Sequence, residues 1–121
     1  MIEVLYVDDE PDIREIAALA LGLDPEFTVK CCASGIEALK IAVDEVPDVI
    51  LLDVMMPLMD GPTTLEHLQQ NPRTAAVPVI FITARTQPQD ITAFRELGAI
   101  GIIAKPFDPM RLAQQVRTLL K

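Results

Sequence analysis

Apolar residues along the chain fall into two alternating patterns, and short polar breaks separate them. Continuous apolar runs of four to eight residues are typical of buried strands, whereas apolar positions three or four apart indicate helices. Unbroken runs lie at residues 49–52 and 79–82, runs interrupted by Glu3 and by Gly101 lie at 2–7 and 100–104, and residues 27–32 read as a further strand in which Thr28 and Lys30 alternate with apolar positions. A segment with helical spacing follows each of them, so the pattern predicts five rounds of strand and helix.

Proline, glycine and small polar residues mark where the predicted helices begin. The five starts are Pro11, Ser34-Gly35, the residues after Gly61-Pro62, Asp90, and Asp108-Pro109. Strands that alternate with helices through short links form a parallel sheet, which the helices cover on both faces. The sequence therefore predicts an α/β fold with a five-stranded doubly wound parallel sheet, and residues 1–121 form one domain.

Composition narrows the classes of function that this fold could serve. The chain has 18 acidic and 10 basic residues, for a formal net charge of −8. An acidic surface repels phosphate backbones, so we expect this domain not to bind nucleic acid by itself. The surplus of acidic residues suggests a basic partner or a bound cation.

Three further features bear on where the protein works. The adjacent Cys31 and Cys32 point to opposite faces of a strand, so we expect free thiols in a reducing compartment. The N-terminal residues carry acidic side chains and no basic leader. No apolar run reaches the roughly 18–20 residues that a membrane span needs. We therefore expect a soluble cytoplasmic protein that does not bind membranes.

Polar side chains stand at the carboxyl ends of four predicted strands. Asp8 and Asp9 follow the first strand, Asp53 the third, Thr83 the fourth and Lys105 the fifth. Ligands of open parallel sheets bind at these ends. A single residue of this kind is usually a turn or cap residue, but chance would rarely place all five there.

This set of side chains indicates metal-assisted phosphoryl chemistry. Neighbouring carboxylates repel one another unless a proton or a cation binds, and carboxylate oxygens suit Mg²⁺ or Mn²⁺. Lys105 and Thr83 would contact phosphoryl oxygens, and an Asp can itself be the nucleophile. Asp53 ends the buried central strand, so it is the best placed nucleophile, whereas Asp8 and Asp9 are better placed to hold metal.

Two other chemistries fit the sequence less well. The loop after the first strand has no Gly, so it is neither a dinucleotide-binding nor a P-loop, and its acidic pair would repel the phosphate of a flavin. A phosphatase of the haloacid dehalogenase type would need a second Asp where Met55 stands, and a cap domain for which the chain has no room. We therefore expect that the chain is not an enzyme.

The residues at the strand ends resemble those of response-regulator receiver domains. The resemblance rests on the following segments, which span most of the chain in the order and spacing of that family: Val7-Asp8-Asp9-Glu10-Pro11, Leu52-Asp53-Val54-Met55-Met56-Pro57, Asp60-Gly61, Thr83-Ala84 and Lys105-Pro106-Phe107. The resemblance implies a flavodoxin-like (βα)5 fold with strand order 2-1-3-4-5.

The resemblance also implies a role for each site residue. Asp53 would accept the phosphoryl group of a phosphohistidine on a sensor histidine kinase or a histidine phosphotransfer protein. Asp9, Asp53 and the backbone carbonyl of Met55 would bind Mg²⁺, and Asp8 would act through water. Lys105, before a cis bond to Pro106, would contact the phosphoryl group, and Thr83 would swing toward it.

The resemblance finally implies an output surface, formed by the fourth helix, fifth strand and fifth helix, that binds a downstream protein and could form a phosphorylation-dependent dimer. Many members have Tyr or Phe where this chain has Ile102, so the coupling of Thr83 to the output surface must run through backbone and loop movement.

The alternative is a receiver-like interaction module that works without phosphorylation. The sequence also leaves open whether the chain is a complete single-domain regulator or the receiver of a longer protein.

Overall fold

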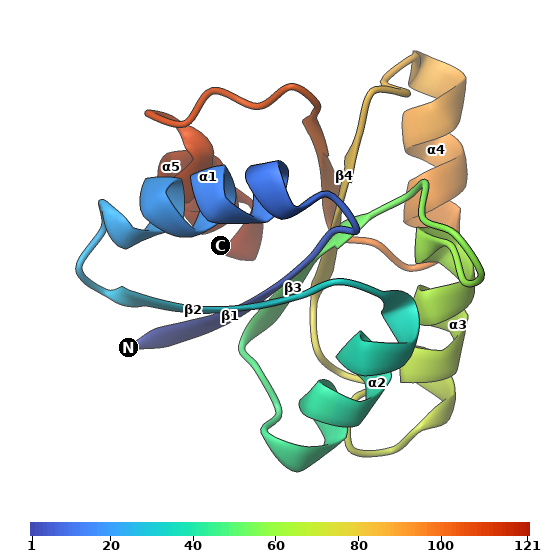
Figure 1. Cartoon of the computed structure of the whole chain (residues 1–121). Helices are drawn as coiled ribbons and strands as arrows, with labels where there is room; N and C mark the ends of the chain where they lie inside the picture. The colour runs from blue at the N-terminus through green and yellow to red at the C-terminus, as the bar shows by residue number, and fades with distance from the viewer.

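The computed structural model describes residues 1–121 and contains five strands and five helices in strict alternation. The strands are β1 (Ile2–Val7), β2 (Phe27–Cys32), β3 (Val49–Asp53), β4 (Val79–Thr83) and β5 (Gly101–Ala104). The helices are α1 (Pro11–Gly22), α2 (Gly35–Asp44), α3 (Gly61–Gln70), α4 (Pro88–Glu96) and α5 (Leu112–Leu120). The strands pair in parallel in the order β2-β1-β3-β4-β5 (Figure 1), so the predicted fold class and strand order are confirmed.

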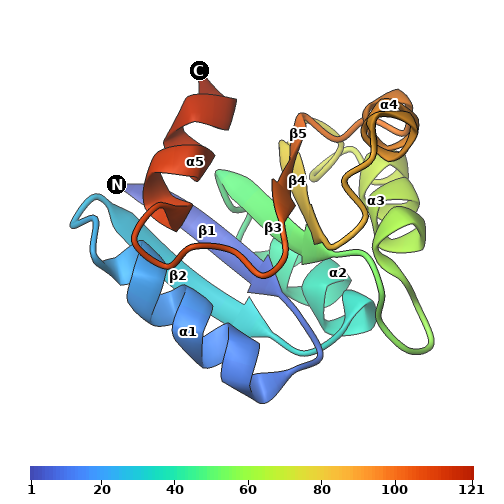
Figure 2. The same ribbon diagram turned by 90° about the horizontal axis from the view of Figure 1, so that it is seen from above.

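Two helical layers enclose the sheet (Figure 2): α1 and α5 cover one face, and α2, α3 and α4 cover the other. Successive strand side chains point to opposite faces, so β1 buries Val4 and Tyr6 against α1 and α5 and buries Leu5 and Val7 on the other side. All five residues of β3 are buried, as expected for a central strand covered on both faces.

Most of the helices begin with residues whose local chemistry favours a helix start. Proline stands in the first turn of α1, α3 and α4, where its missing N–H removes no helical hydrogen bond. Ser34 caps α2, since its side-chain oxygen accepts a hydrogen bond from the Glu37 N–H at 3.1 Å. Asp60 caps α3 in the same way, through the Thr63 N–H at 2.9 Å.

Three predicted helix starts are wrong. The third helix begins at Gly61 and not after Gly61-Pro62, because Asp60 caps it and Pro62 lies in its first turn. The fourth helix begins at Pro88, two residues before Asp90, because this proline occupies its first turn. The last helix begins at Leu112, not at Asp108-Pro109. The Asp108 carboxylate accepts a hydrogen bond from the Met110 N–H, and its carbonyl accepts one from the Arg111 N–H, both at 2.9 Å. These bonds close a separate turn before the helix.

Two smaller observations complete the fold. Cys32 is buried in the core beside α2, whereas Cys31 packs against the core beside α1, and both thiols are free, as predicted. None of the helices combines the length and the apolar character that crossing a membrane requires.

Candidate functional site

The register of the parallel strands brings the predicted site residues to one edge of the sheet. Val7 of β1 lies beside Leu52 of β3, so the residues that follow, Asp8 and Asp53, leave the sheet together. On the other side, Asp53 pairs with Ile82 of β4. The sequence separation of these residues is large, but the strand order makes them neighbours.

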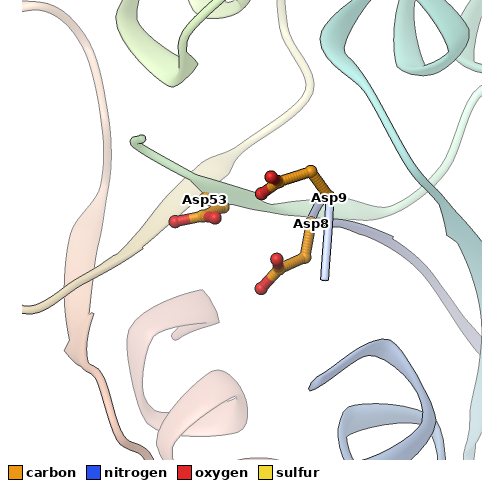
Figure 3. A group of neighbouring side chains, drawn as sticks. All are labelled: Asp8, Asp9 and Asp53. Atoms are coloured by element: carbon orange, nitrogen blue, oxygen red, sulfur yellow. The ribbon is translucent and has the colours of Figure 1, made fainter. Parts of the chain in front are cut away.

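Three carboxylates from two strand ends form an acidic cluster (Figure 3). One oxygen each of Asp8, Asp9 and Asp53 lies within 4.8 Å of the others. Asp8 is 0% exposed and Asp53 is 5% exposed, whereas Asp9 is more exposed than either. The cluster is therefore buried at its base and open to solvent on the side of Asp9.

Lys105 is the cation that reaches this cluster. Its Nζ lies 3.1 Å from Asp8 Oδ2, 3.4 Å from Asp53 Oδ2 and 3.5 Å from Glu10 Oε1. Asp8, Asp53 and Lys105 each follow, by two positions, a residue that packs on the face of α1 and α5. Because residues two apart share a face of a strand, all three side chains extend from the same side of the sheet.

The electrostatic balance of the site is unfavourable for a charged Asp53. Burial of the side chain and the charge of Asp8 raise the Asp53 pKa to about 6, although Lys105 opposes this shift. Burial lowers the pKa of Lys105, but contacts with Asp8 and Asp53 outweigh burial and raise that pKa overall. A single ammonium group therefore compensates the three carboxylates only in part.

The donor set of the cluster fits a hard divalent cation. Carboxylate oxygens are the ligands that Mg²⁺ and Mn²⁺ prefer, and the cluster contains no thiol or imidazole that would favour zinc. A cation here would also offset the uncompensated negative charge. Asp8, Asp9 and Asp53 are the residues that could hold it.

The loop after β3 brings its backbone close to Asp53. The Gly61 N–H donates a hydrogen bond to the Val54 carbonyl at 2.9 Å. A Cβ atom at Gly61 would lie 2.6 Å from the Asp53 carbonyl oxygen, which explains why the smallest residue follows Asp60 here. The Met55 side chain is 74% exposed, so only its backbone carbonyl is a candidate metal ligand.

Thr83 lies at the adjacent strand end but is not joined to the acidic cluster by a hydrogen bond. Its hydroxyl accepts a hydrogen bond from the Arg85 N–H at 3.0 Å, and its carbonyl accepts one from the Lys105 N–H at 2.9 Å. The peptide bond between Lys105 and Pro106 is cis, as predicted. The structure thus gathers four of the five predicted side chains and leaves Thr83 beside them.

Three groups at the site were not predicted from the sequence. The Tyr6 hydroxyl lies 3.4 Å from Asp8 Oδ2, the Glu10 N–H donates to Asp8 Oδ1 at 2.9 Å, and Arg14 donates to the Asp8 carbonyl at 2.7 Å. The contact of Tyr6 could have been predicted, because residues two apart on a strand point to the same face. The contacts of the Glu10 N–H and of Arg14 could not, because nothing in the sequence pattern indicates them.

Comparison with known proteins gives a consistent result across sequence and structure. A family model described as the response regulator receiver domain matches residues 4–117. The DNA-binding dual master transcriptional regulator RpaA of Synechocystis is 36% identical over 100% of this chain and 50% of its own length. Response regulator PleD of Caulobacter vibrioides is 38% identical over 98% of this chain and 26% of its own length.

A solved structure covers the chain almost end to end. The chemotaxis response regulator of Vibrio cholerae superposes with a TM-score of 0.90 at 32% identity, covering 98% of both chains. The two curated relatives are longer than the matched region, and this chain spans half of one and about a quarter of the other.

Proposed function

The chain belongs to the response regulator receiver domain family, and from this premise we propose that Asp53 accepts a phosphoryl group in a two-component phosphorelay. The donor would be a phosphohistidine of a sensor histidine kinase or of a histidine phosphotransfer protein. One observation carries the proposal: the 5% exposed Asp53 carboxylate ends the central strand within 3.4 Å of the Lys105 ammonium and beside two further carboxylates.

In the proposed reaction a carboxylate oxygen of Asp53 forms a bond to phosphorus as the N–P bond of the phosphohistidine breaks. The electron pair of the broken bond stays on the imidazole nitrogen, and the product is an acyl phosphate. Asp53 suits this role because its carboxylate lies within 3.4 Å of the Lys105 ammonium, which would offset part of the negative charge that the phosphoryl group adds.

The neighbouring side chains support the transfer by position and charge. Lys105 is close enough to Asp53 to contact an oxygen of a phosphoryl group bound there. Asp8 and Asp9, with Asp53 and the Met55 carbonyl, would hold Mg²⁺ or Mn²⁺, which supplies positive charge that offsets the phosphoryl oxygens. Thr83 would exchange its hydrogen bond from the Arg85 N–H for one to the phosphoryl group.

We infer that the output surface comprises α4, β5 and α5, and that it binds a downstream protein or a second copy after phosphorylation. Two observations support this surface. Thr83 ends β4 and Lys105 follows β5, and the Lys105 N–H donates a hydrogen bond to the Thr83 carbonyl. Movement at the site would therefore reach both strands. A groove of about 390 Å³ lies along β5 and α5, lined by residues that include Ile102, Arg111 and Leu119.

The test is phosphorylation by a small donor. The protein is incubated with Mg²⁺ and acetyl phosphate, and its intact mass is measured beside that of Asp53→Asn. We expect one phosphoryl mass gain in the wild type, removed by hydroxylamine as an acyl phosphate should be, and none in the variant. A wild type that stays unmodified with several phosphodonors would refute the proposal.

A further inference from the structure

Tyr6 is a buried tyrosine whose position two residues before Asp8 directs it toward the acidic cluster. The side chain is 1% exposed and packs in the core between the sheet and helices α1 and α5. Its ring is therefore an ordinary part of the core. Its hydroxyl, however, is a polar group that must find a partner in an apolar setting.

That partner is the carboxylate of Asp8. The Tyr6 hydroxyl donates to Asp8 Oδ2 at 3.4 Å and makes no other hydrogen bond. The same oxygen accepts the closer bond from Lys105 Nζ at 3.1 Å, while Asp8 Oδ1 accepts from the Glu10 N–H at 2.9 Å. Hydrogen bonds between oxygen atoms are usually about 2.7–2.8 Å long, so the tyrosine contact is the weaker one while Lys105 is present.

The arrangement changes if Lys105 turns to a phosphoryl group on Asp53. Asp8 is 0% exposed, so its Oδ2 atom has no contact with bulk solvent in this structure. The phenol of Tyr6 is then the remaining side-chain donor to that oxygen, and it belongs to the core between the sheet and helices α1 and α5. A buried carboxylate without a donor is costly, and a ligand without a fixed orientation binds metal poorly.

We propose that Tyr6 is a positioning residue for the cation site: its hydroxyl orients the Asp8 carboxylate and keeps it satisfied when Lys105 is drawn away. This inference rests on the proposed function, because it assigns Asp8 to the cation and Lys105 to the phosphoryl group. It extends that function to a core residue outside the acidic cluster.

The test is Tyr6→Phe, which removes the hydroxyl and keeps the ring. We expect the dissociation constant for Mg²⁺, measured by calorimetry, to rise about tenfold, as for other residues that orient metal ligands. The rate of phosphorylation should fall at low Mg²⁺ and recover at saturating Mg²⁺. A variant that binds Mg²⁺ as tightly as the wild type would overturn the inference.

The matched control is Val4→Ala. Val4 is 2% exposed and lies on the same strand and in the same core cluster as Tyr6. The variant should lower stability without changing the affinity for Mg²⁺. An equal loss of affinity in this control would show that general loosening of β1 explains the effect, and would overturn the inference.

A spectroscopic measurement checks the contact itself. Tyr6 is the single tyrosine of a chain without tryptophan, so tyrosine emission reports on this one phenol. A carboxylate that accepts the hydrogen bond of a phenol quenches the emission of that phenol. We therefore expect brighter tyrosine emission from folded Asp8→Asn than from the wild type. Equal emission would overturn the inference.

The two proposals fail differently. If the wild type binds Mg²⁺ and gains phosphate but Tyr6→Phe does the same at equal Mg²⁺, only the role of Tyr6 is wrong. If the wild type does neither, the proposed function is wrong and the role of Tyr6 falls with it.

Discussion

Asp53 occupies a position that raises the free energy of its charged form. Burial and the charge of Asp8 outweigh the nearby ammonium of Lys105, and the Asp53 pKa rises to about 6. A carboxylate with a raised pKa destabilises the folded state at neutral pH. A carboxylate at this position therefore does not favour folding at neutral pH, and an uncharged side chain in its place is expected to be more favourable.

We therefore predict that Asp53→Asn stabilises the protein in the absence of divalent cations. A pKa shift of about two units, at about 1.4 kcal/mol each, allows a gain of up to about 3 kcal/mol in the free energy of unfolding at pH 7.5. The folded wild type takes up a proton at Asp53 as the pH falls through 6, whereas the unfolded chain does so only near 3.8. The wild type thus recovers stability on acidification, and the gain of the variant shrinks toward pH 4.5.

Urea unfolding of both proteins in EDTA at pH 7.5 and at pH 4.5 measures this difference. Comparison at each pH cancels the titration of the other groups. A variant that is less stable than the wild type at pH 7.5, or whose gain is the same at both pH values, contradicts this view of Asp53.

The segment between β3 and α3 shows how an element positions the site. Gly61 begins α3 against the backbone of β3, where an added Cβ would lie 2.6 Å from the Asp53 carbonyl oxygen and 2.9 Å from the Val54 Cα. Backbone atoms in a central strand cannot yield cheaply, so α3 or the end of β3 would have to shift.

We therefore predict that Gly61→Ala lowers the free energy of unfolding by about 1–3 kcal/mol, the usual cost of overpacking, and slows phosphorylation of Asp53. Thermal or urea unfolding and the rate of mass gain with acetyl phosphate measure the two effects. Gly22→Ala is the matched control, because nothing lies within 4 Å of an added Cβ there. If both variants behave like the wild type, the close approach at Gly61 has no functional consequence.

The elements also show how far sequence patterns reach. Apolar runs located β3 and β4 most clearly, because strands inside a parallel sheet must be apolar on both faces, whereas the edge strand β2 carries Thr28 and Lys30 and shows only an alternating pattern. The start of α5 was misplaced because Asp108-Pro109 has the residue types of a helix start, although the Asp108 side chain closes a separate turn. The contact of Tyr6 with Asp8 was missed because an apolar strand pattern counts tyrosine as a core residue.

At the scale of the whole molecule, the proposed output surface can be compared with the contacts that hold α5 in place. Arg117 fixes the C-terminal part of α5 to the loop before β2, since its guanidinium pairs with Asp24 and with Glu26 and lies 5.2 Å from the Phe27 ring centroid. Ile102 is half-buried in β5 and offers no aromatic ring that could change rotamer. If the proposed output surface responds to phosphorylation, we expect the movement to pass through the β4–α4 loop and the start of α5.

For the whole molecule we predict that phosphorylation changes the amide chemical shifts across residues 90–116 in nitrogen–proton NMR spectra. Within this range the expected changes are largest at the start of α5. Outside it we expect large changes near Arg85 and small ones near Arg117, which its ion pairs hold in place. Asp53→Asn treated with the same donor is the control. Identical shifts across 90–116 in the free and phosphorylated protein would mean that the site and this surface are not coupled.

Chemical trapping identifies the phosphorylated residue itself. Borohydride reduces an aspartyl phosphate to homoserine, so the protein is treated with acetyl phosphate and Mg²⁺, reduced, digested and sequenced by mass spectrometry. We expect homoserine in place of Asp53 alone, and no reduced residue in Asp53→Asn. Homoserine in place of Asp8 or Asp9, or at no position in a correctly folded sample, would contradict the assignment of Asp53 as the phosphoryl acceptor.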